Sequence, residues 1–293
     1  MNQTLSVSDK QRNARSILKR IGKFKTIPAV VTTLMKMTKD DSSTFENFEA
    51  VIKYDPTLVV KILKLVNSPY YALRTKIKSI SEALAFLGVE NLRNLIVLDA
   101  LKNVFAKDSQ KDLFSRKKLW LHCVAVNICS QMIMERIFEK KGEDAFLCGI
   151  LHDFGFIVED QAAHILFQKL CNTFDSENHK ITEHEQLIFG TDHCTIGYLL
   201  SEEWGMPSEV REGIRDHHST STKIEPESLA GIIQISEFMT QRLSYKAFPE
   251  IKTELSKTML VHLRDNINEY RAITEDLPAE LKKAEVIYQL EDE

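Results

Sequence analysis

Apolar residues recur at helical spacing along most of the chain. Four of them share one face of a predicted helix over residues 44–54, namely Phe45, Phe48, Val51 and Ile52. A second helix is predicted to begin at Pro56, because Asp55 suits the N-cap position and proline suits the first helical turn. No stretch alternates cleanly between apolar and polar residues, as a half-buried strand would. The pattern predicts an all-α protein.

A short helix that ends at Gly88 precedes a longer apolar one. Ser79 and Glu82 form a predicted capping box at its start, and the glycine closes it. The arrangement resembles a DNA-binding helix-turn-helix, but the second helix, residues 90–103, carries only two basic residues. The sequence therefore does not favour nucleic acid as a partner.

Composition agrees with long helices in a cytoplasmic protein. The 293 residues include only ten glycines and seven prolines, so turns are scarce and many-stranded folds are disfavoured. The net charge of −4 does not suit a polyanion-binding protein. Five cysteines form no C-x-x-C pair, as expected of reduced thiols. The chain shows no apolar stretch typical of a membrane helix or a signal peptide, so no membrane association is expected.

The segment from Lys10 to Lys25 holds seven Lys or Arg residues and no acid. Such a segment can bind an anionic partner, or it can be the solvated face of an amphipathic helix docked on the protein. Apolar residues at helical spacing within it favour the docked helix.

A polar, basic stretch over residues 106–118 marks a predicted junction within the chain. We expect an N-terminal helical half over residues 1–110 and a helical bundle over residues 111–245. Amphipathic helices over residues 246–293 are expected to pack on the outside of that bundle.

Histidines and acids interrupt several apolar helical runs. His152 and Asp153 stand inside the run LCGILHDFGF, and burying such groups without partners costs several kcal/mol. The other interruptions are His122, His193 and the pair His217-His218. A single core histidine more often bonds a carbonyl group than a metal. Several such groups from separate helices nevertheless indicate a shared metal site.

Nitrogen and oxygen ligands favour Fe, Mn or Zn over Ca or Mg. We expect one or two such ions, or none if the polar groups only bond one another. Two ions sharing the Asp153 carboxylate would activate water for attack on a phosphate ester. The nearby Cys123, Cys148 and Cys194 are interpreted as small core hydrophobes.

Several motifs occur in the order seen in HDOD domains, the HD-related output domains of bacterial signalling. The chain resembles this family over about residues 24–240, through IPAVVTTLMKM, YDPTLVVKILKLVNSPYY and SISEALAFLGVENLRNLIV, then LWLHCVAVN, FLCGILHDFGFIV and TDHCTIGYLLSEEWGMPSEVREGIRDHH. The resemblance implies a multi-helical HD-domain-like bundle with an additional N-terminal helical layer, in a bacterial signalling protein. Relatives of the family include HD and HD-GYP metal-dependent phosphohydrolases.

The resemblance carries metal-ligand positions onto this chain. His122 matches the first HD histidine, and His152 with Asp153 matches the defining pair. His193 matches the histidine of an H-P-x-x-G segment, in which Cys194 replaces the proline. His217 and His218 match the paired histidines of HD-GYP enzymes, and Glu237 takes the place of the closing aspartate, with one more methylene. The implied ligands are His122, His152, Asp153 and Glu237 for one ion, and Asp153, His193, His217 and His218 for another.

Two departures concern the substrate rather than the ligands. Phe156 stands where the enzymes carry the lysine of an I-G-K segment, and STSTKIEP replaces their G-Y-P loop. The sequence therefore favours a non-catalytic signalling module with a degenerate metal pocket, acting through protein partners. The alternative is a metal-dependent phosphohydrolase or phosphodiesterase that acts on a nucleotide or phosphate ester, with Asp153 as its catalytic residue.

Overall fold

Every regular element in the described part of the chain is a helix. The computed structural model describes residues 6–20, 44–53, 56–68, 73–105, 114–245 and 251–289, together with residues 33, 37 and 71. The all-α fold class is thereby confirmed. The helices group into two compact units. The larger unit comprises Met1–Phe24 and Phe105–Glu275, and the smaller unit comprises Lys25–Val104 and Asp276–Glu293.

The larger unit holds most of the helices. They are α1 (Val7–Arg20), α7 (Arg116–Arg136), α8 (Glu143–Leu151), α9 (Phe154–Ala162), α10 (His164–Thr173), α11 (Ile181–Phe189), α12 (His193–Glu203), α13 (Ser208–Asp216), α14 (Leu229–Arg242) and α15 (Lys257–Asp265). The last helix, α16 (Ile267–Gln289), begins in this unit and ends in the smaller one.

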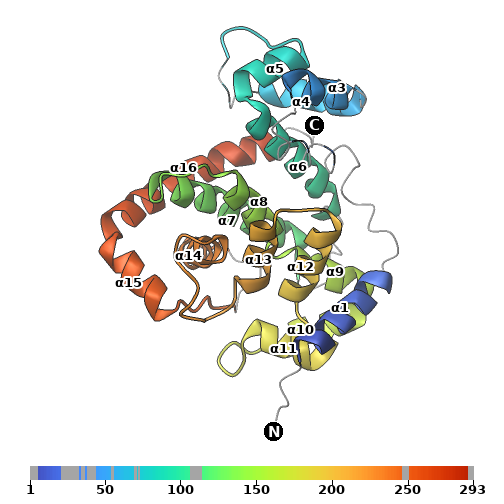
Figure 1. Cartoon of the computed structure of the whole chain (residues 1–293), viewed down its shortest axis with the longest axis vertical. Helices are drawn as coiled ribbons and strands as arrows, with labels where there is room; N and C mark the ends of the chain where they lie inside the picture. Colours follow the sequence, from blue (N-terminus) through green and yellow to red (C-terminus); the bar gives the residue numbers. More distant parts are fainter. Residues whose placement is uncertain are drawn as a thin grey trace. The chain divides into compact units, whose positions relative to one another are not determined.

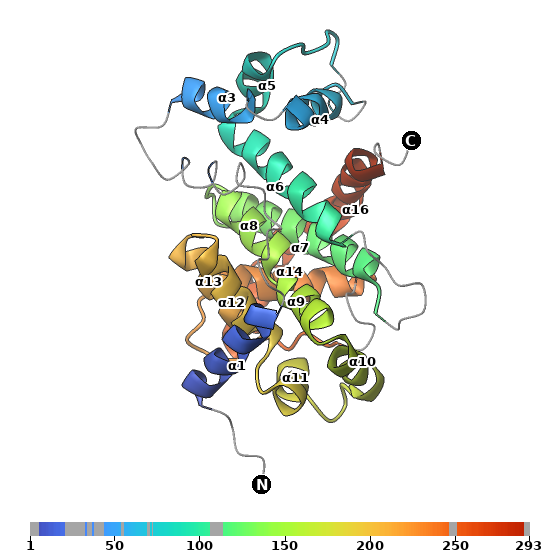
Figure 2. The same ribbon diagram turned by 90° about the vertical axis from the view of Figure 1, so that its right-hand side faces the viewer.

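The core of the larger unit surrounds α7 and α14. Helix α7 packs against α8 and α14, and α13 packs against α8, α12 and α14, as Figures 1 and 2 show. Because neighbours cover it on several sides, α7 is buried along most of its length. This burial explains why its sequence is apolar almost all round, with His122 as an exception that needs a polar partner.

The smaller unit contains α3 (Phe45–Lys53), α4 (Pro56–Val66), α5 (Ile80–Leu87) and α6 (Val89–Phe105). Helices α3, α4 and α5 pack on one another. Ser79 caps α5 by accepting the backbone N–H of Glu82 at 3.1 Å, and the Glu82 carboxylate accepts the N–H of Lys78 at 2.8 Å. Gly88 ends the helix with φ at 79°, a left-handed value that favours glycine.

Helix α1 carries the described part of the basic segment, whose residues 21–25 lie outside the described residues. It packs against α9 and α12 with Ala14, Ile17 and Leu18 buried. Asn13 donates to the carbonyl oxygen of Gly190 at 2.9 Å, and Lys10 Nζ lies 3.6 Å from Asp192 Oδ2. These contacts support the interpretation of a docked amphipathic helix.

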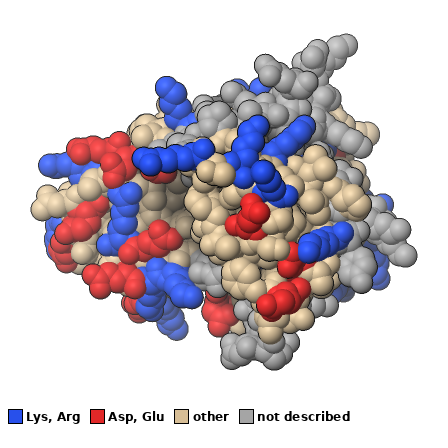
Figure 3. Space-filling model, turned by 90° about the horizontal axis from the view of Figure 1, so that it is seen from above, with Lys and Arg blue, Asp and Glu red and all other residues tan. Residues whose placement is uncertain are grey.

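Charged side chains of both signs lie next to one another on part of the face seen in Figure 3. Within the described residues, the helices are too short or too polar to cross a bilayer. The division into regions 1–110, 111–245 and 246–293 stays a prediction, as do the protein partners.

Candidate metal centre

Seven side chains of the larger unit form two groups that share one carboxylate. His122, His152, Asp153 and Glu237 make the first group, and Asp153, His193, His217 and His218 make the second. Within each group, one potential ligand atom per residue lies within 4.8 Å of all the others. All seven are buried except His218, which is half-buried. The structure thus brings together every residue that the sequence singled out, and their role as ligands stays a prediction.

Asp153 stands between the two groups. Helix α8 ends at Leu151 and α9 begins at Phe154, so this side chain projects from the break between two helices. Its Oδ2 lies 3.4 Å from Nε2 of both His122 and His152. Its Oδ1 lies 3.4 Å from Nε2 of His193 and 3.6 Å from Nε2 of His217. The two oxygens of a single carboxylate therefore face different groups.

Four histidines present the same nitrogen to these groups because their other nitrogen is already bonded. The Nδ1 atoms of His122, His152 and His217 donate to the carbonyl oxygens of Tyr245, Gly149 and Ile214, at 3.1, 2.7 and 2.7 Å. His193 Nδ1 lies 2.8 and 2.9 Å from the two carboxylate oxygens of Glu185. Such bonds fix the ring orientation and leave Nε2 free for an ion.

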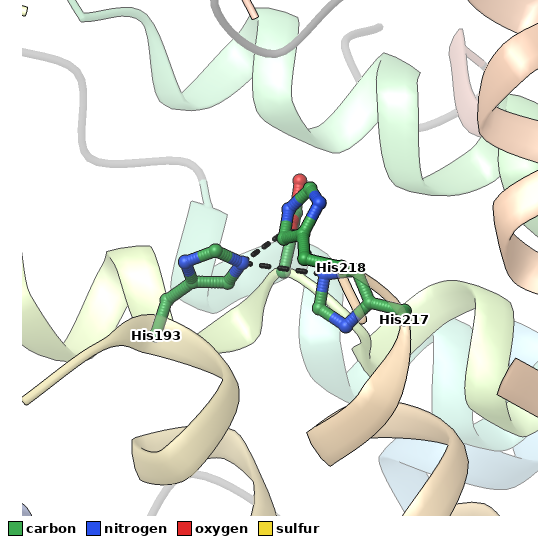
Figure 4. A group of neighbouring side chains, drawn as sticks. His193, His217 and His218 are labelled. Atoms are coloured by element: carbon green, nitrogen blue, oxygen red, sulfur yellow. Dashed lines mark hydrogen bonds and ion pairs between the residues drawn. The ribbon is translucent and has the colours of Figure 1, made fainter. Parts of the chain in front are cut away.

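The polar atoms inside the groups are only partly satisfied by one another. Nε2 of His122 lies 3.2 Å from Nε2 of His152, and His193 and His217 face each other in the same way at 3.3 Å (Figure 4). Asp153 Oδ1 and Glu237 Oε2 are buried without a hydrogen-bond partner. Bare polar atoms in such a place are costly, and a divalent cation would satisfy them. Nitrogen and carboxylate donors fit a transition-metal ion.

Glu237 belongs to the first group in spite of its extra methylene. Its Oε1 lies 3.6 Å from Nε2 of His152 and 3.8 Å from Nε2 of His122. The side chain is 2% exposed and comes from α14, in the centre of the larger unit. The carboxylate of Glu237 therefore lies beside His122 and His152, where the closing aspartate of the related enzymes was expected.

The two groups differ in the protons they hold. In the first group burial opposes a positive charge, but Asp153 and Glu237 outweigh it and raise the pKa of His122 to about 9 and that of His152 to about 10. In the second group burial prevails and lowers the pKa of His193, His217 and His218. Burial alone would raise the pKa of Asp153, yet the charge of His152 and the contact with His122 hold it well below its usual range.

Metal binding by the first group is expected to strengthen with pH. A lower pH keeps protons on His122 and His152, whose pKa values are about 9 and 10, and these protons compete with the ion. The apparent affinity should therefore rise about tenfold per pH unit for each displaced proton, up to those pKa values. Calorimetric titration with Zn²⁺ between about pH 6.5 and 8.5 measures the affinity at each pH. Repeating it in two buffers of different ionisation enthalpy gives the number of protons released per ion bound. An affinity that does not change over this range would contradict the assignment of protons.

Glu185 is a functional candidate that the sequence analysis missed. It is fully buried and accepts both Nδ1–H and the backbone N–H of His193. Burial raises its pKa well above the usual value, and nearby Asp192 adds to the effect. A signal was present, because Glu185 lies four residues after Ile181 on the buried face of α11. An acid on an apolar face points to a buried partner.

Replacing Glu185 with Gln is expected to weaken metal binding by the second group. The amide presents one oxygen and can turn its NH₂ group toward His193, whereas Glu185 places two oxygens 2.8 and 2.9 Å from His193 Nδ1, so the variant orients His193 less firmly. Losing such an outer partner typically costs about 10- to 100-fold in metal affinity. Competition with a chromogenic chelator measures the loss. Glu183→Gln, an exposed site on the same helix, is the matched control and should bind as the wild type does. Equal affinities for all three proteins would contradict the role of Glu185.

Two cavities in the larger unit reach His218. One has a volume of about 270 Å³ and is lined by His217, His218, Lys180 and Lys252, among others. The other has a volume of about 250 Å³ and is lined by His218, Lys10, Tyr198 and Arg215, among others. A small molecule can therefore approach the second group from the side of His218, and each cavity is lined by basic and acidic side chains.

The sequence matches one protein family and one uncharacterised bacterial protein. The model of the HDOD domain family matches residues 24–220. An uncharacterised protein of Treponema pallidum is 25% identical over 207 residues, which make up 70% of this chain and 40% of that protein. The chain thus matches less than half of this relative's length.

Two solved structures extend the comparison. An HDOD domain protein of unknown function from Geobacter sulfurreducens is 22% identical, with a TM-score of 0.69 over 93% of this chain and 99% of the other. A proposed phosphohydrolase from Shewanella amazonensis is 21% identical, with a TM-score of 0.62 over 89% of this chain and 98% of the other. At these identities the likeness concerns the fold.

Proposed function

The chain belongs to the HDOD family, and we propose that it is a metal-dependent phosphohydrolase or phosphodiesterase acting on a nucleotide or another phosphate ester. The observation that carries the proposal is the position of Asp153, whose two carboxylate oxygens face two separate groups of nitrogen and oxygen donors. A carboxylate shared in this way is suited to hold two ions side by side.

The prediction of a non-catalytic module with a degenerate pocket is wrong. It rested on Phe156 and on the missing G-Y-P loop, but the buried donor set is intact and a protein of similar fold is a proposed phosphohydrolase. Phe156 and the missing loop change residues that would surround a substrate, whereas the side chains of the two donor groups are all present. Phe156 itself is fully buried and stacks on the His193 ring, with centroids 4.0 Å apart and planes at 21°. Phe156 therefore packs against His193 and helps to hold its ring in place.

Two divalent ions would supply Lewis acidity, lowering the pKa of water and offsetting the charge of the phosphate. The residues of the chain have separate tasks in this chemistry. Asp153 would hold both ions, and the buried hydrogen bonds at Nδ1 would keep the four imidazoles in one tautomer. Because these groups are fixed before the substrate arrives, little reorganisation is needed during the reaction.

The cavities beside His218 are suited to admit the substrate. Lys10 and Arg215 line one of them, and Lys180 and Lys252 line the other. We propose that these cations bind the phosphate in place of the lysine that Phe156 replaces. Each would exchange its present carboxylate partner for a phosphate oxygen; the partners are Asp192 for Lys10, Asp216 for Arg215, Glu254 for Lys180 and Glu177 for Lys252. Ammonium and guanidinium groups are the usual partners of phosphate oxygens in proteins.

Hydrolysis of bis-p-nitrophenyl phosphate tests the proposal. Protein freed of metal by a chelator should release nitrophenolate only after Mn²⁺, Fe²⁺ or Zn²⁺ is added, because the residues alone supply no Lewis acid. Asp153→Asn should release none above background, and its matched control Asp265→Asn, at an exposed site outside both groups, should react at the wild-type rate. If folded, metal-loaded protein hydrolyses neither this diester nor nucleotide monoesters and diesters above background, the proposed function is wrong.

A further inference from the structure

Helix α1 contacts the turn that leads into His193. Asn13 donates from Nδ2 to the carbonyl oxygen of Gly190 at 2.9 Å. Gly190 ends α11 with φ at 69°, and a Cβ added to it would collide with the amide of Asn13. Asp192 then caps α12 by accepting the backbone N–H of Thr195 at 2.8 Å, and His193 is the first residue of that helix. Asn13 therefore holds the backbone three residues before a member of the second group.

Buried contacts dock α1 on the larger unit. Ala14, Ile17 and Leu18 are buried, and the helix packs against α9 and α12. Helix α12 carries His193, and α9 carries Phe156, whose ring stacks on that histidine. Helix α1 thus packs on both of the helices that place this histidine ring.

The same helix forms part of the wall of the cavity of about 250 Å³ beside His218. Val7, Lys10 and Gln11 of α1 line this cavity together with Tyr198 of α12, among others. Helix α1 ends at Arg20, whereas the part of the chain that the HDOD family model matches begins at residue 24. The family match therefore assigns no role to α1.

We propose that α1 is a positioning element of the second group and that Asn13 is the residue through which it acts. This inference rests on the metal centre of the proposed function. Lys10 also contacts the turn, but it would release it for the phosphate of a substrate, so the bond from Asn13 to Gly190 is the contact that remains. Docked α1 holds the turn over residues 190–192 and with it the start of α12. Detaching α1 lets His193 move, which weakens metal binding by the second group.

The first group provides the comparison within the chain. Its own donors come from α7, the end of α8 and α14; they are His122, His152 and Glu237. The two groups share only Asp153. A contact that acts through His193 should therefore change the metal affinity of the second group and leave that of the first group unchanged. A merely structural contribution of α1 would change the stability of the whole unit and affect both groups.

Zinc affinity measured one group at a time tests the inference on the full-length protein. Competition with a chromogenic chelator measures the second group in a His122→Ala background and the first group in a His217→Ala background. Asn13→Ala should weaken binding by the second group up to about tenfold, the net worth of one hydrogen bond, and leave the first group unchanged. The matched control is Ser16→Ala, at an exposed site on the same helix, which should change neither affinity. Ala14→Glu places a charge at a fully buried site, so it should detach the helix and have at least as large an effect.

Hydrogen exchange provides a second readout, which needs no change in α1. Coupling between two sites is reciprocal, so an ion in the second group should in turn hold α1 in place. Zinc should therefore slow amide exchange over residues 7–20 in the wild type more than in His217→Ala, which keeps only the first group.

The outcomes separate this inference from the proposed function. If the wild type binds zinc at both groups and Asn13→Ala binds it as tightly as Ser16→Ala does, the positioning role is overturned and the metal centre stands. Equal losses of affinity at both groups would also overturn it, because they would reveal a general loss of stability. Folded wild-type protein that binds no zinc would remove the metal centre itself, and the inference with it.

Discussion

Replacing Asp153 with Asn is expected to empty both donor groups and reduce diester hydrolysis to background. The amide has nearly the same size, but it lacks the charge and the second acceptor oxygen that let one side chain face both groups. Removing an outer partner alone costs about 10- to 100-fold in metal affinity, so losing a shared ligand should cost more at each group. Elemental analysis and the diester assay measure the two effects.

Comparison with His122→Ala shows whether Asp153→Asn loses metal because its carboxylate is shared by both groups or because any substitution in the centre disrupts both. His122 contacts only the first group, so this variant should keep the ion of the second group and lose the other. Far-UV circular dichroism checks that each variant is folded. If Asp153→Asn retains two ions per chain, or loses no more metal than His122→Ala does, then Asp153 does not join the two groups.

Replacing Gly155 with Ala is expected to destabilise the larger unit and to displace His193. An added Cβ would lie 2.1 Å from the carbonyl oxygen of His193 and 2.6 Å from its Cα. These are backbone atoms, so the clash is relieved only if α9 and α12 separate. Overpacking of a core costs about 1–3 kcal/mol, and occasionally more. An unstrained Gly to Ala change inside a helix would instead stabilise by about 0.5–1 kcal/mol.

Urea unfolding of the Gly155→Ala variant measures the cost, and zinc content measures the effect on the second group. The control is Gly142→Ala. The atoms nearest to its added Cβ would be Gln131 Cγ at 2.5 Å and Glu135 Oε1 at 2.9 Å, which belong to side chains and can shift without moving a helix. Its free energy of unfolding should change by about 1 kcal/mol at most. If the Gly155→Ala variant is as stable as the wild type and binds as much zinc, then neither stability nor zinc binding depends on the close approach of α9 and α12.

The helical fold was predictable because local signals and the apolar spacing agree. Ser79 caps α5 as its sequence context predicts, and α1 buries the apolar side of the basic segment. The members of the two groups were also recognisable. A histidine and an aspartate inside an apolar helical run must find a polar partner, and the family resemblance supplied the remaining positions.

The supporting bonds of the site were not predictable from residue types. Three histidines are oriented by backbone carbonyl groups, which every residue possesses, and the carbonyl of Tyr245 lies far from His122 in the sequence. The place of Glu185 four residues after Ile181 indicated a buried acid, but nothing in the residue types indicated that His193 is its partner. The functional prediction failed for a related reason, because the absence of a substrate-binding lysine says little about buried donors elsewhere.

Anomalous diffraction from crystals of the zinc-loaded protein tests the central claim most directly. Data collected at the zinc absorption edge locate each ion without reference to activity or to a chosen substrate. We expect two peaks, one among His122, His152 and Glu237 and one among His193, His217 and His218, with one oxygen of Asp153 directed at each. Crystals of folded protein that show no peak at either group, or one peak that Asp153 does not contact, would contradict a shared metal centre.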